Sequence, residues 1–249
     1  MRVSASALRG LPEVGAGDDL GALIAAAAPE PLHDGDVLCV AHKVVSKAEG
    51  RVRSLADVEP GERARELAAA HDKDPRQVQV VLDETVELLR AERGVLICRT
   101  RHGLVCANAG VDASNTGAPD ELVLLPADPD GSARALRARL RELTDAAPAV
   151  VITDSFGRTW RHGQCDVALG CAGLRPLDDW RGRRDAAGRE LRATWIALAD
   201  SVAAAADLVR AKDSREPVVL VRGLERHVSP DDGPGAAALV RPPAEDLFR

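Results

Sequence analysis

The chain has 249 residues, of which 45% are hydrophobic and 29% charged, a composition typical of soluble globular proteins. Only 2% are aromatic and the formal net charge is −6, so the sequence lacks the stacking side chains and the basic surface that a nucleic-acid partner needs. No apolar run is long enough to span a membrane, and no signal-peptide pattern opens the chain, so we expect a cytoplasmic protein without a membrane partner.

The first part of the chain alternates helical and strand patterns. An aspartate opens the apolar run at 18–28, which predicts an N-capped helix. A buried strand is expected at about 36–41, followed by a polar loop. Residues 60–72 and 75–92 are predicted as helices, the second with Pro75 in its first turn, a position that suits proline.

The middle of the chain predicts a hairpin, a strand, a helix and a second buried strand. Residues 94–110 contain two apolar runs around "TRHG", which favours a β-hairpin, and "ELVLLP" at 121–126 favours a strand. Residues 128–146 form an amphipathic helical pattern with a cationic outer face. The apolar run that begins at 149 is expected to be a strand that stops at Asp154.

The last part of the chain contains a charged segment, a helix, a strand and a tail. Residues 174–193 are expected to be an exposed insert, and the Ala-rich run at 194–211 predicts a helix. "PVVLVRGL" at 217–224 predicts a closing strand, and the Pro- and Gly-rich residues 226–249 are expected to wrap the surface. Strands that alternate with helices indicate an α/β fold with a mixed sheet and flanking helices, in a single domain over 1–249.

The cysteine pattern favours reduced thiols. The cysteines are odd in number, none forms a CxxC pair, and three lie in apolar, strand-like runs. We therefore expect buried free thiols and no zinc site. The five residues are Cys39, Cys98, Cys106, Cys165 and Cys171.

Lysine is scarce, because only four of the 33 Lys and Arg residues are lysine. A lysine retained in such an Arg-rich sequence suggests a position that needs an ammonium group. Two of them, Lys43 and Lys47 in "KVVSK", follow the strand at 36–41, where they could neutralise phosphate. The segment lacks the spacing of a Walker A loop, so a solvated surface loop remains the alternative.

Two aspartates at expected strand ends are candidate metal ligands. Asp154 ends the strand that begins at 149, and Asp112 follows another strand in "GLVCANAGVDASNTG". Ser155 and Asn115 supply neighbouring oxygens, and ligands gather at strand ends in open α/β sheets. Oxygen donors of this kind suit Mg²⁺ or Mn²⁺. The alternative is that both aspartates only initiate turns, where Asp is common.

Cationic and imidazole groups follow Asp154 in "FGRTWRHG". Arg158 and Arg161 can bind carboxylate or phosphate through two parallel hydrogen bonds, so they are candidates for a catalytic role. His162 could act as a general base, with a purely structural role as the alternative.

Ordered motifs give the chain a resemblance to a known family. The matching segments are "GLPEV" (10–14), "HKVVSKAEGR" (42–51), "ANAGVDASN" (107–115), "LLPADPDGSA" (124–133), "TDSFGRTWRHGQCDVALG" (153–170) and "PVVLVRGL" (217–224). Together they resemble the coenzyme F420-0:L-glutamate ligase family, also called F420 gamma-glutamyl ligases. Each motif is only moderately specific, and their shared order over nearly the whole chain makes the resemblance strong.

The resemblance implies an activity and a set of partners. Such enzymes are ligases that use GTP and Mg²⁺ or Mn²⁺ to add L-glutamate to coenzyme F420-0 through an acyl phosphate, with later glutamates joined by γ-links. The implied fold is the unusual α/β fold of this family, as a homodimer. Some relatives carry a nitroreductase-like domain after the ligase domain, and none is expected here.

The resemblance also assigns roles to individual positions. It implies metal ligation by Asp112, Asp154 and Ser155, where Ser155 replaces the more usual Thr and keeps the hydroxyl. It implies nucleotide contacts by Leu11, Pro12, Glu13, Val14, His42, Lys47 and Asn115, with His42 in place of a more usual Ser. No ligand role can be assigned near Lys212, where the pattern diverges. Two other functions stay open: a metal-dependent phosphohydrolase and a non-catalytic GTP-binding module.

Overall fold

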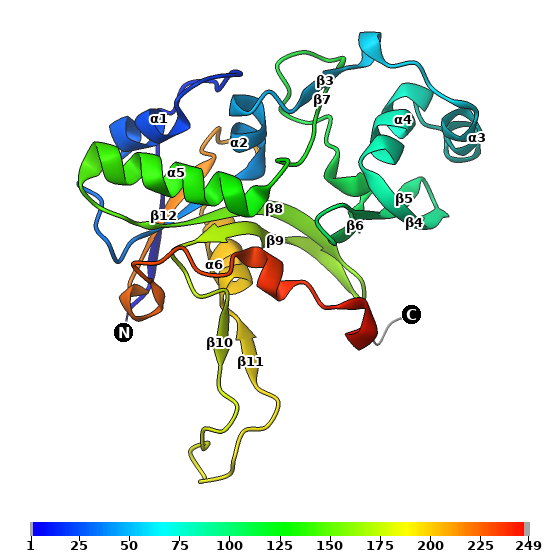
Figure 1. Cartoon of the computed structure of the whole chain (residues 1–249). Coiled ribbons are helices and arrows are strands. Elements are labelled where there is room, and N and C mark those ends of the chain that lie inside the picture. The colour runs from blue at the N-terminus through cyan, green and yellow to red at the C-terminus, as the bar shows by residue number, and fades with distance from the viewer. Residues whose placement is uncertain (1, 247–249) are drawn as a thin grey trace.

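A computed structural model describes residues 2–246, and a five-stranded mixed sheet lies at its centre (Figure 1). Only the β2–β8 pair is parallel, and the other neighbours are antiparallel. The α/β class with a mixed sheet is therefore confirmed. In spatial order the strands are β1 (Ser4–Ala7), β12 (Val218–Arg222), β2 (Val37–Ala41), β8 (Ala149–Arg158) and β9 (Arg161–Ala172).

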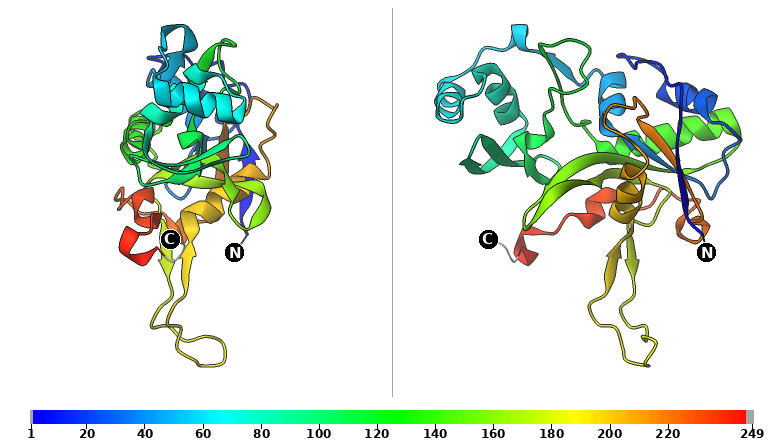
Figure 2. Two further views of the ribbon diagram at one scale, coloured as in Figure 1. Left: turned by 90° about the vertical axis from the view of Figure 1, so that its right-hand side faces the viewer. Right: turned by 180° about the vertical axis from the view of Figure 1, so that it is seen from behind.

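Helices cover both faces of this sheet. Helices α1 (Leu20–Ala27) and α5 (Pro129–Thr144) pack on one face, and α6 (Leu198–Asp207) packs on the other (Figures 1 and 2). Strand β2 is therefore buried on both sides: Leu38 packs in the cluster with α1 and α5, and Cys39 packs in the cluster with α6. A strand buried on both faces is apolar at every position, which is why its sequence shows no alternation.

A smaller lobe lies beside the central sheet, at the right of Figure 1. It has its own apolar cluster, formed between two helices and a three-stranded sheet. A two-stranded ribbon lies between the lobe and the sheet. The elements are α3 (Glu62–His71), α4 (Pro75–Asp83), β4 (Thr85–Glu92), β5 (Val95–Thr100) and β6 (Val105–Ala107), with β3 (Val52–Ser54) and β7 (Glu121–Val123) in the ribbon.

The prediction of one helix over 75–92 is wrong in its second half. The helix α4 ends at Asp83, and β4 then pairs with β5 through a two-residue turn. The turn residues Arg93 and Gly94 have φ values of 52° and 76°. Positive φ at both positions defines a turn that matches the twist of a hairpin, and this pairing overrides the helical propensity of "ELLRAE".

Three further segments differ from the predictions. The expected polar loop after β2 is helix α2 (His42–Ala48), which buries His42, Val45 and Ser46 on one face. Strand β8 does not stop at Asp154, because its polar end continues to pair with β9 as a hairpin. The helix expected at 194–211 begins at Leu198, since the preceding residues form strand β11 (Trp195–Ala197).

The expected insert and tail are both found. Strands β10 (Leu177–Asp179) and β11 frame a hairpin that projects from the main body (Figures 1 and 2), and most of its residues are exposed. The tail wraps the surface as short 3₁₀ turns as far as residue 246, and residues 247–249 lie outside the described part. The 3₁₀ turns of the chain are η1 (Leu55–Asp57), η2 (Asn108–Gly110), η3 (Glu225–His227), η4 (Ala236–Leu239) and η5 (Pro243–Glu245).

All five cysteines are free thiols, as expected, and Cys165 is the one that is only half-buried. Burial raises the pKa of Cys39 and Cys106 to about 12, so these thiols stay protonated at neutral pH. Within residues 2–246, no helix combines the length and the apolar character required to cross a bilayer.

Arg137 attaches the tail to the body. Its guanidinium is buried and donates to the carbonyl oxygens of Ser229 (2.7 Å) and Pro230 (3.1 Å). It also pairs with the Asp232 carboxylate at 2.7 Å. A single buried cation therefore satisfies several tail acceptors at once.

Arg137→Met should lower the free energy of unfolding by about 3 kcal/mol, because it leaves buried carbonyl oxygens and one carboxylate without a donor. Chemical denaturation measures this. The control is Arg141→Met, an exposed position on the same helix, which should change stability by less than about 0.5 kcal/mol. Equal stability of the two variants would contradict the role of Arg137.

Candidate active site

The parallel register of β2 and β8 brings the first two residues of the candidate site together. Ala41 lies opposite Thr153, so the next residues, His42 and Asp154, emerge side by side at the same edge of the sheet. The imidazole Nε2 of His42 lies 3.5 Å from Oδ1 of Asp154. His42 is fully buried as the first residue of α2, and the Asp154 side chain is 20% exposed.

These two groups do not form an ion pair at neutral pH. Burial, with the nearby charge of Lys43, lowers the pKa of His42 to about 3, so the imidazole is neutral. Burial also raises the pKa of Asp154 to about 7, and the negative charges of Asp112 and Asp166 add to the shift. Burial therefore disfavours the ionised form of Asp154.

Asp112 reaches the same site from the smaller lobe. It follows η2 and exchanges backbone hydrogen bonds with Val123 of β7. The Lys43 ammonium lies 2.7 Å from Asp112 Oδ2 and donates to the Ser114 hydroxyl. Burial alone would raise the pKa of Asp112, and the hydrogen bonds from Lys43 and the Ser114 N–H instead bring it below its usual value. The first two residues of α2 thus link Asp154 to Asp112.

Asp166 is a third carboxylate that the sequence did not assign. It lies on β9 opposite Ser155 and is almost completely buried. It accepts hydrogen bonds from the hydroxyls of Ser155 (2.6 Å) and Thr153 (3.1 Å) and forms an ion pair with Arg210. The sequence contained a feature that could have identified it, because Asp166 is the one charged residue in the otherwise apolar run "CDVALGCA".

Lys212 joins this network from the segment after α6. Its ammonium donates to the Ser155 hydroxyl and lies 3.7 Å from Asp207. No ligand role could be predicted for Lys212 from its sequence pattern, yet the structure places it beside Ser155, a predicted metal ligand. Lys43 and Lys212 therefore approach the candidate metal site from two sides.

The predicted nucleotide contacts lie around helix α2. Lys47 is buried and forms an ion pair with Glu13, in the segment 11–14. Val14 belongs to the core, and Leu11 packs against it. Asn115 lies in an exposed loop beside Ser114, which Lys43 holds, and has a φ of 56°. The structure thus brings His42, Lys47 and the segment 11–14 to one region, with Pro12 exposed.

The two arginines predicted as catalytic lie elsewhere. Arg158 and Arg161 flank the tip of the β8–β9 hairpin, where both are exposed. Arg158 donates to the carbonyl oxygen of His162 at 2.6 Å, which braces the turn. Within the described residues neither arginine contacts Asp112 or Asp154, so their catalytic role stays a prediction.

The oxygen donors suit a hard divalent cation such as Mg²⁺ or Mn²⁺ better than a softer ion such as Zn²⁺. In residues 2–246, no three His, Cys, Asp or Glu side chains are grouped as a metal site. The candidate donors are instead two carboxylates and a hydroxyl, which Mg²⁺ commonly uses together with phosphate oxygens and water. The raised pKa of Asp154 fits this, because a bound cation would stabilise the ionised form of a carboxyl group that burial disfavours.

Comparison with known proteins points to one family. A sequence profile described as F420-0:Gamma-glutamyl ligase matches residues 10–223. The chain is 48% identical over 235 residues to the coenzyme F420:L-glutamate ligase of Methanopyrus kandleri, covering 94% of this chain and 92% of that protein. It is 43% identical over 254 aligned residues to the enzyme of the same name from Methanothermobacter thermautotrophicus, covering both chains fully. It is 49% identical over 228 residues to that of Halobacterium salinarum, covering 89% and 87%.

The raised pKa of Asp154 predicts a pH-dependent effect of Asp154→Asn on metal-free protein. Between pH 4 and 7 the unfolded carboxyl ionises while the folded one keeps its proton, so wild type loses stability as pH rises. The variant avoids this loss. It should match wild type near pH 4 and be more stable by about 4 kcal/mol at pH 8.

Urea denaturation in the presence of a chelator measures this difference at both pH values. Adding Mg²⁺ at pH 8 should stabilise wild type and not the variant. A stability difference that is the same at pH 4 and pH 8 would contradict the raised pKa.

Proposed function

The chain belongs to the F420-0:gamma-glutamyl ligase family, and from this premise we propose that it uses GTP and a divalent cation to join L-glutamate to coenzyme F420-0. Ligation is the activity for which its curated relatives are named. The observation that supports the GTP and metal requirements is the meeting of Asp112 and Asp154 with Lys43 and Lys212 at one edge of the sheet.

Amide formation from a carboxylate requires an activated acyl group. In the proposed reaction, a carboxylate oxygen of F420-0 attacks the γ-phosphorus of GTP, the bond to the β-phosphate oxygen breaks, and GDP leaves. The amine of L-glutamate then attacks the acyl phosphate carbon, the C–O bond to phosphate breaks, and the amine loses its proton. The products are the glutamyl amide, GDP and phosphate.

The side chains of the site suit these steps. Lys47, on α2 beside the segment 11–14, and Lys43 would bind phosphate oxygens, and Lys212 would supply a cation on the opposite side. Asp112, Asp154 and Ser155 would hold Mg²⁺ or Mn²⁺. When bound, the cation would neutralise charge on the transferring phosphoryl group. Neutral His42 packs against Asp154 and keeps bulk water from that side of the carboxylate.

We also propose, from the family resemblance, that the protein acts as a homodimer. Arg158 and Arg161 lie on a hairpin whose tip carries Trp160, 79% exposed. A second copy packed against this tip would bury that ring. Any catalytic contribution of the two arginines then depends on substrates or a partner reaching the hairpin.

The protein should add one glutamyl unit to F420-0 for each GTP converted to GDP. Mass spectrometry of the product, after incubation with F420-0, L-glutamate, GTP and Mn²⁺ or Mg²⁺, measures this. GTP hydrolysis without either acceptor would favour a phosphohydrolase, and binding without turnover would favour a GTP-binding module. Asp154→Asn should lower ligation by about 100-fold or more.

Lys47→Met should raise the KM for GTP or lower kcat, because the ammonium group faces the segment assigned to the nucleotide. The matched control is Lys47→Arg, which keeps the charge and should retain more activity. Thermal unfolding confirms that both variants fold. Unchanged GTP kinetics in Lys47→Met would remove this residue from the site.

A further inference from the structure

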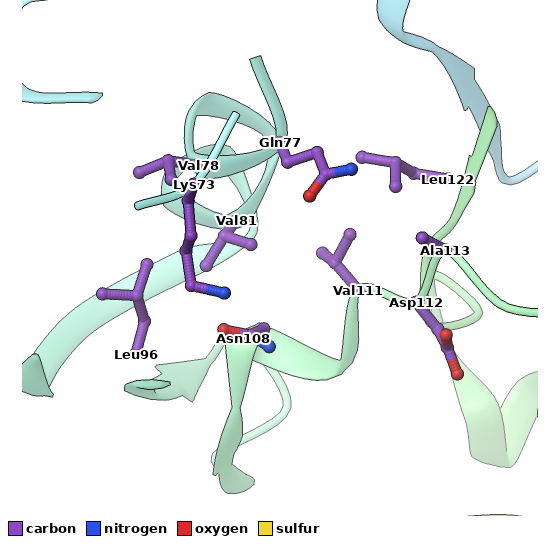
Figure 3. A pocket seen from close by; sticks show the side chains of 10 residues that line it. All are labelled: Lys73, Gln77, Val78, Val81, Leu96, Asn108, Val111, Asp112, Ala113 and Leu122. Carbon is purple, nitrogen blue, oxygen red and sulfur yellow. The ribbon is translucent and has the colours of Figure 1, made fainter. Parts of the chain in front are cut away.

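A cavity opens next to Asp112, between helix α4 and the segment that joins η2 to β7 (Figure 3). Its volume is about 170 Å³. Pockets for drug-sized ligands are about 300–1,000 Å³, so this cavity suits a smaller molecule. The apolar part of its wall is formed by Val78, Val81, Leu96, Val111 and Leu122.

The polar groups of the cavity are few and differ in charge. Lys73 is its only cation among the lining residues, Gln77 and Asn108 add two amides, and Asp112 is its only carboxylate. Figure 3 shows Lys73 and Asp112 on opposite sides of the space. Asp112 is already paired with Lys43, so the cavity itself is left with the positive charge of Lys73.

Neither Lys73 nor Asn108 is fully satisfied by the protein. The half-buried Lys73 ammonium has no carboxylate partner in the described residues. Asn108 has a buried side-chain oxygen without a hydrogen-bond partner within residues 2–246. Buried polar atoms are nearly always paired, so such groups around one cavity indicate a polar ligand.

The chain's lysines provide a second, independent observation. Each of its four lysines lies at the carboxylate cluster or next to a feature that adjoins it: Lys43 and Lys212 at the cluster, Lys47 beside the segment 11–14, and Lys73 in the cavity that Asp112 also lines. Everywhere else the sequence uses arginine as its cation. A compact ammonium group is therefore concentrated around one site.

We propose that this cavity binds the incoming L-glutamate and that Lys73 pairs with its side-chain carboxylate. The inference rests on the proposed ligase activity. L-Glutamate carries a net charge of −1, which Lys73 balances, and its methylene groups match the apolar wall. Its α-amine must reach the acyl phosphate near Asp112, which leaves the other end of the molecule to extend toward Lys73.

Other substrates fit this space less well. F420-0 contains a deazaflavin ring system and is too large for it. GTP is assigned to the opposite side of Asp112, around α2 and the segment 11–14. Gln77 can donate amide N–H bonds to a carboxylate, and the unpartnered Asn108 oxygen can accept from the amine of the same amino acid.

Steady-state kinetics of Lys73→Met test the assignment. We expect the KM for L-glutamate to rise at least tenfold, with the KM values for GTP and F420-0 within about twofold of wild type. The preference for L-glutamate over L-glutamine, measured as the ratio of kcat/KM, should fall about tenfold, because only the charged side chain needs the ammonium. Lys73→Arg should restore most of this preference, and Arg65→Met on the exposed face of α3 should behave as wild type.

Each possible result either supports or overturns the assignment of this cavity to L-glutamate. An unchanged L-glutamate KM and preference in a folded Lys73→Met variant overturns the proposal, and a raised KM for GTP or F420-0 alone reassigns the cavity to that substrate. If no ligation occurs, the proposed function fails and calorimetric titration of L-glutamate tests the cavity separately. Binding to wild type that weakens at least tenfold in Lys73→Met supports the proposal, and no binding to wild type overturns it.

Discussion

The parallel pairing of β2 with β8 is the constraint on which the site depends. It is the one parallel contact in a sheet that is otherwise antiparallel, and it sets Ala41 opposite Thr153. The residues that follow this pair leave the sheet on the same edge, where open α/β sheets bind ligands. One strand continues into helix α2 and the other into the polar half of β8, so a neutral imidazole and a carboxylate meet there.

The carboxylates at this edge differ in how their charges are offset. Asp112 is stabilised by Lys43, and Asp166 by Arg210, whereas Asp154 has no cationic hydrogen-bond partner in the described residues and has its pKa raised to about 7. A divalent cation would bind the unpaired carboxylate most readily and compete with Lys43 for Asp112. Metal binding and proton release from Asp154 are therefore linked.

Much of the fold and site could be predicted from the sequence, and the failures share a cause. Buried strands such as β2 and helix α5 have patterns that depend only on local burial. Strand β4 and the polar end of β8 form by pairing with the strands that follow them, β5 and β9, and the pattern inside each segment does not show this pairing. Asp166 was missed for the same reason, since its role is set by Ser155 and Arg210, 11 and 44 positions away along the chain.

The proposed reaction requires Asp112 and Asp154 to act as one cation site. Anomalous diffraction from crystals grown with Mn²⁺ and a non-hydrolysable GTP analogue tests this most directly. We predict a manganese peak with oxygens of both carboxylates at about 2.0–2.2 Å, and Lys43 released from Asp112. A manganese ion bound to neither aspartate, with Lys43 still paired to Asp112 and the nucleotide in place, would contradict the account.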